Sequence, residues 1–184
     1  MREIAAIRRF EGNLLEIASK LKPDLGASIA INGACLSAVK SEANSFAVEL
    51  SSHSREQLAI ENFAPNARVH LEPALKYGDS IDGHLLQGHV DGIGTLIRRI
   101  KRESGEDFFF RLPEHLLPYV SLKGSIALDG VSLTISGLKG VEIMLSIIPI
   151  SLAHTLFSSF SPGRRVHVET DLLARYAARI LEFR

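Results

Sequence analysis

The chain has 184 residues, of which 46% are hydrophobic and 23% are charged. This length suits one ordinary domain or two small ones, and the composition supports a packed core. The 21 basic and 21 acidic residues leave no formal net charge, and aromatic residues make up 7% without any tryptophan. We therefore expect no nucleic-acid partner, because phosphate binding needs a basic face and base stacking needs aromatic side chains.

Cys35 is the only cysteine, so an intrachain disulfide is impossible. This cysteine usage suits a reducing compartment, and we expect a cytoplasmic protein. Residues 1–12 contain no long apolar run, which argues against a signal peptide. The longest apolar stretches are far shorter than a membrane-spanning helix, so we expect no membrane association.

Short segments with alternating or β-branched residues predict strands along the whole chain. In chain order these segments are residues 7–9, 45–52, 68–72, 97–99, 141–148 and 165–169. The glycine-containing turn signals between them are Asn32-Gly33, Asp129-Gly130 and Lys139-Gly140. Many short strands with such turns favour a mainly β fold built as a small barrel or sandwich.

Three further stretches predict helices. Residues 54–63 begin with Ser54 as a candidate N-cap, and residues 151–157 take the same place later in the chain. Residues 171–183 put apolar side chains on one helical face, at Leu173, Ala177, Ile180 and Leu181. A terminal amphipathic helix with no obvious cavity to fill predicts a contact between subunits.

The sequence contains an internal repeat. Residues 26–37 match residues 123–134 at an offset of 97 residues (123 − 26), and residues 68–72 match residues 165–169 at the same offset. Between these blocks, Ser54 falls on Ser151. A shared offset over three separate blocks indicates that one β module occurs twice.

The opening strands of the two copies match at an offset of 90 instead, residues 7–9 with residues 97–99. The second copy is therefore longer by about seven residues (97 − 90), and the polar residues 101–107 predict the hairpin loop that contains them. Residues 83–90 have no counterpart ahead of Met1. We therefore expect the first module to lack its opening strand.

Four segments together resemble riboflavin synthase of the alpha-chain type, a family with a tandem lumazine-binding repeat. They are NGACLS at residues 32–37, GHLLQGHVDGIG at residues 83–94, LKGSIALDGVSLT at residues 122–134 and the IP-x-S-L run at residues 148–152. The resemblance covers essentially the whole chain and includes the repeat spacing. Family members begin with an additional short strand that has no match here.

The resemblance implies two six-stranded, Greek-key-like barrels, at residues 1–83 and 84–169, and a C-terminal helix at residues 170–184. It implies a homotrimer, with the active site between the first barrel of one subunit and the second barrel of another. It leaves open an association with lumazine synthase.

The implied reaction is a dismutation of two molecules of 6,7-dimethyl-8-ribityllumazine by transfer of a four-carbon unit. The products are riboflavin and 5-amino-6-ribitylaminouracil, and no metal or redox cofactor takes part. A duplicated module suits this chemistry, because it holds two identical reactants in register and lowers the barrier by proximity.

The resemblance implies that equivalent segments of both copies bind the substrates. The implied binding residues are Cys35, Leu36, Ser37, Glu49, Leu50, Ser51, Ser52, His53, Ser54, Gly88, His89, Val90, Lys123, Ser132, Leu133, Thr134, Ser146, Ile147, Ile148, Pro149, Ile150 and Ser151. The implied catalytic residues are Ser28, Cys35, His89 and Asp171. His89 is a candidate proton carrier because imidazole titrates near neutrality. Ser28 and Asp171 are expected at the subunit junction, where they activate a nucleophile at C7 of one lumazine and steer protons from the C7 methyl of the other.

Structural roles remain open for these residues. Cys35 can be an inert packed side chain, and Ser54 or Asp171 can cap a helix. Lys123 can be a solvated turn residue, and Asp129 is expected chiefly to form a turn.

Three alternative functions also remain open. His84, His89 and Asp91 are a rival metal site, although they are few ligands for zinc. A non-catalytic lumazine or flavin carrier is a second alternative, and the retained DGVSLT and IP-x-S-L segments favour the enzyme over it. An oligonucleotide-binding barrel is a third, and the zero net charge and scarce aromatics count against it.

Overall fold

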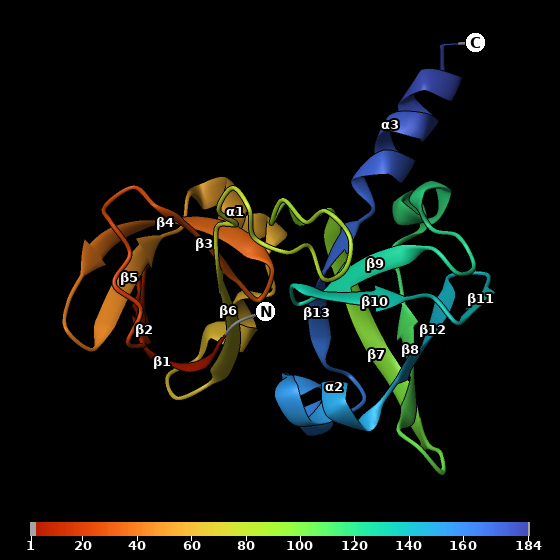
Figure 1. The fold of residues 1–184 in the computed structure, drawn as a ribbon, viewed down its shortest axis with the longest axis horizontal. Coiled ribbons are helices and arrows are strands. Elements are labelled where there is room, and N and C mark those ends of the chain that lie inside the picture. The colour runs from red at the N-terminus through yellow and green to blue at the C-terminus, as the bar shows by residue number, and fades with distance from the viewer. Residues whose placement is uncertain (1–2, 184) are drawn as a thin grey trace.

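The computed structural model describes residues 3–183, and two β modules lie side by side in it (Figure 1). The strands of the first module are β1 (Glu3–Glu11), β2 (Leu14–Ala18), β3 (Ser28–Ile31), β4 (Ala34–Ser41), β5 (Ser45–Glu49) and β6 (Arg68–Pro73). They form a closed barrel in the order β1-β2-β5-β4-β3-β6. The predicted mainly β fold is confirmed, while the division of the chain after residue 83 stays a prediction.

The second module repeats this topology. Its strands are β7 (Gly92–Lys101), β8 (Glu106–Arg111), β9 (Ser125–Leu128), β10 (Val131–Thr134), β11 (Gly137–Lys139), β12 (Glu142–Ile147) and β13 (Arg165–Thr170). Their order is β10-β9-β13-β7-β8-β12-β11. The end strands β10 and β11 are consecutive in the chain, so the sheet curls round, and together they take the place of β4.

Each module encloses its own hydrophobic core, because alternate residues along each strand point inward. In the first core Leu15, Ile17 and Phe46 are buried. In the second core Phe108 and Phe157 meet edge to face, with ring centroids 5.6 Å apart. Such an aromatic pair contributes about 0.5–1.5 kcal/mol beyond the area that it buries.

The first barrel closes with its own opening strand. Strand β1 pairs with β2 on one side and β6 on the other, as β7 pairs with β8 and β13. Residues 83–91, which precede β7, contain no strand. The prediction that the first barrel lacks a strand is therefore wrong: the unmatched segment of the second copy is a connection without regular structure.

The extra residues of the second copy lie in two places. The β7–β8 hairpin loop has four residues, 102–105, against two, 12–13, in the first copy. The rest lies between β8 and β9, where the 3₁₀ helix η2 (Glu114–Tyr119) buries Leu116. The prediction that residues 101–107 contain the whole insertion is wrong, because matched blocks give only the total length between them.

Both predicted internal helices are shorter and begin earlier than expected. Helix α1 (Ser52–Gln57) has Ser51 as its N-cap, whose side chain accepts a hydrogen bond from the Ser54 amide. Ser54 is therefore not the cap. After an extended residue at Leu58, the chain forms a separate 3₁₀ helix, η1 (Ile60–Phe63).

The equivalent helix α2 (Pro149–His154) starts at a proline, whose fixed φ and missing N–H suit the first helical turn. Ser151 therefore lies inside the first turn instead of capping it. Thr155 is extended and breaks the helix, and η3 (Leu156–Ser159) follows.

The C-terminal helix α3 (Leu172–Leu181) projects away from both modules (Figure 1). Asp171 caps it, since its carboxylate accepts a hydrogen bond from the Leu173 amide at 2.9 Å. None of its residues is buried, and Leu173 and Ile180 are 71% and 60% exposed. Among the described helices none has the length and apolar character needed to cross a membrane.

A buried histidine of the first module reaches into the second. His70 on β6 accepts a hydrogen bond at Nε2 from the Leu156 amide, 2.8 Å away. Its Nδ1 lies 2.9 Å from the carbonyl oxygen of Asp129. Since Nε2 accepts, Nδ1 carries the proton and donates to that carbonyl, so the ring is neutral.

His167 on β13 makes the equivalent contacts in the opposite direction. Its Nε2 accepts from the Ala59 amide at 2.9 Å, and its Nδ1 lies 2.8 Å from the carbonyl oxygen of Asn32. The side chains of Asn32 and Asp129, in left-handed turns, accept from the backbone amides of His70 and His167. An approximate two-fold relation therefore joins the modules, and Asp129 is both the expected turn former and part of this contact.

Candidate functional site

The first-module surface is formed by β4 and the end of β5. Cys35 and Ser37 point outward from β4, while Leu36 between them is buried. Ser37 is the register partner of Glu49, which is also exposed. Strand alternation thus brings a thiol, a hydroxyl and a carboxylate to one outer face.

The start of α1 continues this surface. Leu50 is fully buried and anchors the turn, while Ser51, Ser52 and His53 are exposed. The Ser51 and Ser54 hydroxyls lie 2.9 Å apart. Exposed hydroxyls at this turn can bond the polar groups of a ligand.

A segment from the connection between the modules completes the first-module surface. The Gly88 carbonyl accepts a hydrogen bond from the Cys35 amide at 2.8 Å. Gly88 has φ +76°, and a Cβ there would lie 2.6 Å from the Cys35 Cβ, so only glycine fits. Val90 packs against the first core, and His89 between them is exposed.

The second-module surface has equivalent parts with one difference. Ser132, Leu133 and Thr134 lie on β10, and the exposed residues 148–150 lead from β12 into α2. Ser146, however, donates its hydroxyl hydrogen to Asp107 at 2.7 Å. That hydrogen bond, together with Arg102, lowers the pKa of Asp107, so the Ser146 hydroxyl is held by a carboxylate. Ile147 is buried below this surface.

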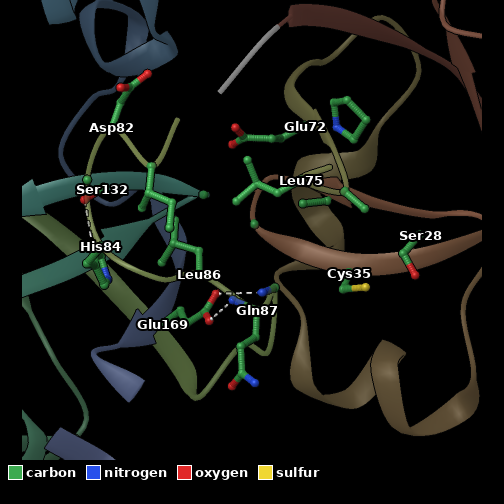
Figure 2. A pocket seen from close by; sticks show the side chains of 18 of the residues that line it. Ser28, Cys35, Glu72, Leu75, Asp82, His84, Leu86, Gln87, Ser132 and Glu169 are labelled. Carbon is green, nitrogen blue, oxygen red and sulfur yellow. Dashed lines mark hydrogen bonds between the residues drawn. The ribbon is translucent and has the colours of Figure 1, made fainter. Parts of the chain in front are cut away.

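A cavity of about 440 Å³ lies between the modules. Ser28 and Cys35 of the first module, Ser132 of the second and residues 80–84 and 86–88 of the connection contribute to its lining. Figure 2 shows Glu72 and Glu169 entering it from opposite modules.

Glu72 and Glu169 were not among the predicted site residues. They occupy equivalent positions on β6 and β13, so the repeat itself contains the signal that could have found them. Glu169 is almost fully buried and accepts hydrogen bonds from the Gln87 and Gly88 amides at 2.7 and 3.0 Å. Burial raises the pKa of Glu169 above its ordinary value, although these two amides oppose that shift.

The rival metal site is not formed. His84 Nδ1 lies 2.7 Å from the Ser132 hydroxyl, and Asp91 is bound by Thr170 and Arg175. Within residues 3–183, no three His, Cys, Asp or Glu side chains converge as metal ligands. Burial lowers the pKa of His84, with Asp171 acting in the opposite direction.

The four implied catalytic residues are only partly brought together within one chain. Ser28 and Cys35 line the same cavity, and His89 follows Gly88 beside Cys35. Asp171 is outside that lining and caps α3. Its helix-capping role is therefore present in the structure, and its catalytic role stays a prediction.

Lys123 adopts a backbone conformation that disfavours lysine. It has φ +67°, whereas Gly26 stands at the equivalent position of the first copy with φ +82°. A left-handed conformation costs a residue with a Cβ roughly 1–2 kcal/mol. A side chain kept at this cost is a candidate for ligand contact, as the resemblance implies.

We expect Lys123→Gly to raise the free energy of unfolding by about 1 kcal/mol, because glycine tolerates a positive φ. The same change should weaken binding of the lumazine substrate. Denaturant unfolding and ligand titration measure the two effects. Gly26→Lys is the matched control: it has open space around its Cβ position and should destabilise by a similar amount. Unchanged substrate affinity in Lys123→Gly would leave the lysine as a turn residue only.

The family model described as lumazine binding domain matches the chain twice, at residues 1–74 and 87–171. The crystal structure of LumP complexed with 6,7-dimethyl-8-(1'-D-ribityl) lumazine has the same fold, with a TM-score of 0.80 and 17% identity over 92% of this chain and 96% of that one. The riboflavin complex of LumP superposes with a TM-score of 0.81 over 91% and 95% of the two chains, again at 17% identity. Fold and surfaces together define a tandem lumazine-binding protein.

Two curated relatives specify the family further. Riboflavin synthase of Brucella abortus (strain 2308) is 39% identical over 181 residues, which cover 94% of this chain and 90% of that protein. Riboflavin synthase of Photobacterium phosphoreum is 37% identical over 157 residues, covering 85% and 72%. The chain belongs to the riboflavin synthase family and is an enzyme of that family.

Proposed function

We propose that this protein converts two molecules of 6,7-dimethyl-8-ribityllumazine into riboflavin and 5-amino-6-ribitylaminouracil. One molecule donates a four-carbon unit to the other. The two products together contain all the atoms of the two substrates, so the transfer needs no external oxidant or reductant. The two equivalent outer surfaces, one on each module, support this proposal because the reaction uses two copies of one compound.

The observation that carries the proposed intersubunit site is the path of residues 83–88. A Cβ on Gly83 would lie 2.6 Å from the Ser132 hydroxyl, and Gly88 bonds the Cys35 amide. The connection therefore runs between Cys35 and Ser132 of the same chain. We propose that a second chain of a homotrimer brings its second-module surface against this first-module surface.

The proposed roles of the side chains follow from this arrangement. Cys35 and His89 lie at the first-module surface, where a group that exchanges protons can act on the bound lumazine. Ser28 and Asp171 are proposed to activate a nucleophile at C7 of one lumazine and to steer protons from the C7 methyl of the other. Lys123 is proposed to contact a ribityl chain.

The test is to incubate the protein with 6,7-dimethyl-8-ribityllumazine alone and to follow riboflavin by absorbance. We expect riboflavin and the aminouracil product in equal amounts. Tight binding of the substrate without riboflavin formation would replace this proposal with the lumazine or flavin carrier.

Assembly through α3 is the second testable part of this proposal. Leu173→Glu and Ile180→Glu each place a charge on an apolar, exposed helix face. We expect these variants to sediment as monomers and to lose most of their turnover, because burial of an unpaired charge at an interface is unfavourable. Glu182→Ala is the control, because Glu182 is exposed and forms an ion pair with Arg179 on the same helix. Full turnover by a monomeric variant would exclude an intersubunit site.

A further inference from the structure

Residues 87–91 line the first-module surface but have no regular secondary structure. Their contact with Cys35 uses one backbone hydrogen bond, from the Cys35 amide to the Gly88 carbonyl. A segment without its own helix or sheet pairing keeps one conformation only if other groups hold it. Side chains of β13 and α3, which belong to the far end of the sequence, make these contacts.

Glu169 on β13 holds the first end of the segment. Its two carboxylate oxygens accept separate hydrogen bonds from the backbone amides of Gln87 and Gly88, at 2.7 and 3.0 Å. Hydrogen bonds to an ionised carboxylate are roughly twice as strong as neutral ones. Because the side chain of Glu169 is buried, water competes little for these bonds.

Asp91 holds the other end. One of its carboxylate oxygens accepts hydrogen bonds from both the amide and the hydroxyl of Thr170, each at 2.7 Å. The Asp91 amide donates to the carbonyl of Val168 at 2.8 Å. The segment is thus fastened at both ends to β13.

Arg175 on α3 connects the two ends. Its guanidinium donates to Asp91 at 3.1 Å and to the side-chain oxygen of Gln87 at 3.0 Å, and it lies 3.9 Å from a Glu169 oxygen. The Arg175 side chain is only 23% exposed, although it belongs to a helix that otherwise projects outward. The attachment of α3 therefore bears directly on the position of Gly88.

We propose that Glu169 and Arg175 are positioning residues that hold Gly88 and His89 against the first-module site and so couple the attachment of α3 to ligand binding there. This inference rests on the proposed function for the identity of the ligand. Neither residue needs to touch the substrate. If subunit contacts order α3, then assembly also completes the first-module site, and the helix has a role in the site as well as in the interface.

The local test uses Cys35, the only cysteine in the sequence, as a reporter of the neighbouring segment: its thiol is exposed, and Gly88 lies against its Cβ and backbone amide. Glu169→Gln and Arg175→Ala should each raise the rate of Cys35 modification by Ellman's reagent severalfold, because the Gly88 carbonyl no longer stays in place. Arg179→Ala is the matched control, since Arg179 lies on the same helix and pairs with Glu182 instead of the segment. Equal modification rates in all three variants and the unchanged protein would overturn the proposal.

The second readout is steady-state kinetics. We expect both variants to raise KM about 10-fold, as for the loss of one hydrogen bond to a charged group, with a smaller change in kcat. Arg175→Lys should restore part of the loss, because an ammonium can still reach Asp91. A fall in kcat alone, with KM unchanged, would contradict a positioning role.

The two proposals can fail separately. If the unchanged protein makes no riboflavin but Glu169→Gln still speeds the modification of Cys35, the proposed reaction is wrong and the positioning role stands. If riboflavin forms and neither variant alters the rate of Cys35 modification or KM, the positioning role is wrong. If Glu169→Gln fails to fold, Arg175→Ala still tests the positioning role, because a substitution on the exposed helix α3 leaves both cores intact.

Discussion

Gly130→Ala is expected to lower the free energy of unfolding by several kcal/mol and to separate the two modules. Gly130 has φ +79°, and a Cβ there would lie 2.8 Å from the Gly33 nitrogen and 2.9 Å from its Cα. The left-handed conformation costs alanine roughly 1–2 kcal/mol, and overpacking against fixed backbone adds about 1–3 kcal/mol. Because both turns belong to the contact between modules, neither can move without breaking other hydrogen bonds.

Denaturant unfolding followed by circular dichroism measures this loss. Gly140→Ala is the matched control: Gly140 also has a positive φ, +57°, but has nothing within 4 Å of its Cβ position. It should lose only the conformational part, roughly 1–2 kcal/mol. Equal losses in the two variants would mean that the approach of Gly33 to Gly130 contributes nothing to stability.

The second large effect is a loss of stability in mild acid. Burial lowers the pKa of His70 below its ordinary value of 6.5, although Asp129 opposes the shift. The unfolded chain therefore takes up a proton near pH 6.5, while the folded protein resists protonation until a lower pH. Stability is complete above pH 6.5 and falls as the pH drops from there toward the folded pKa of His70.

The physical reason is the hydrogen bonding of the ring. A protonated His70 has donors on both nitrogens, so Nε2 can no longer accept the hydrogen bond from the Leu156 amide. His70→Leu should remove the part of the acid loss that His70 causes and also lower stability at pH 8 by about 1–3 kcal/mol, because a buried amide and a carbonyl lose their partner.

Unfolding titrations between pH 8 and pH 5 test this prediction. His154→Gln, which changes an exposed histidine on α2, is the matched control. A profile for His70→Leu that matches the unchanged protein would show that another group causes the acid loss.

Much of the architecture could be predicted from the repeat. Two copies of one residue pattern fold alike, so the match of residues 26–37 with 123–134 was enough to expect equivalent hairpins and equivalent site positions at Cys35 and Ser132. The Asn32-Gly33 and Asp129-Gly130 turns also form as expected, because local φ preferences determine them.

The first residues of the helices and the position of the insertion were harder to predict from the sequence. Ser51 caps α1 where Ser54 was expected, because two nearby serines offer the same chemistry and only the path of the chain chooses between them. The extra residues before β9 form η2. The matched blocks on either side give only the total length between them, so they do not show where the extra residues lie.

The sequence by itself determined the duplicated fold, the family and the equivalent surfaces, because these depend on local patterns and on residues that repeat at constant spacing. Only the tertiary structure decided how Glu169 and Arg175 hold residues 87–91, and how His70 and His167 join the modules. Those contacts link residues that lie between 59 and 135 positions apart. No local pattern encodes such pairs, since only the packing of the two modules and of α3 brings their members together.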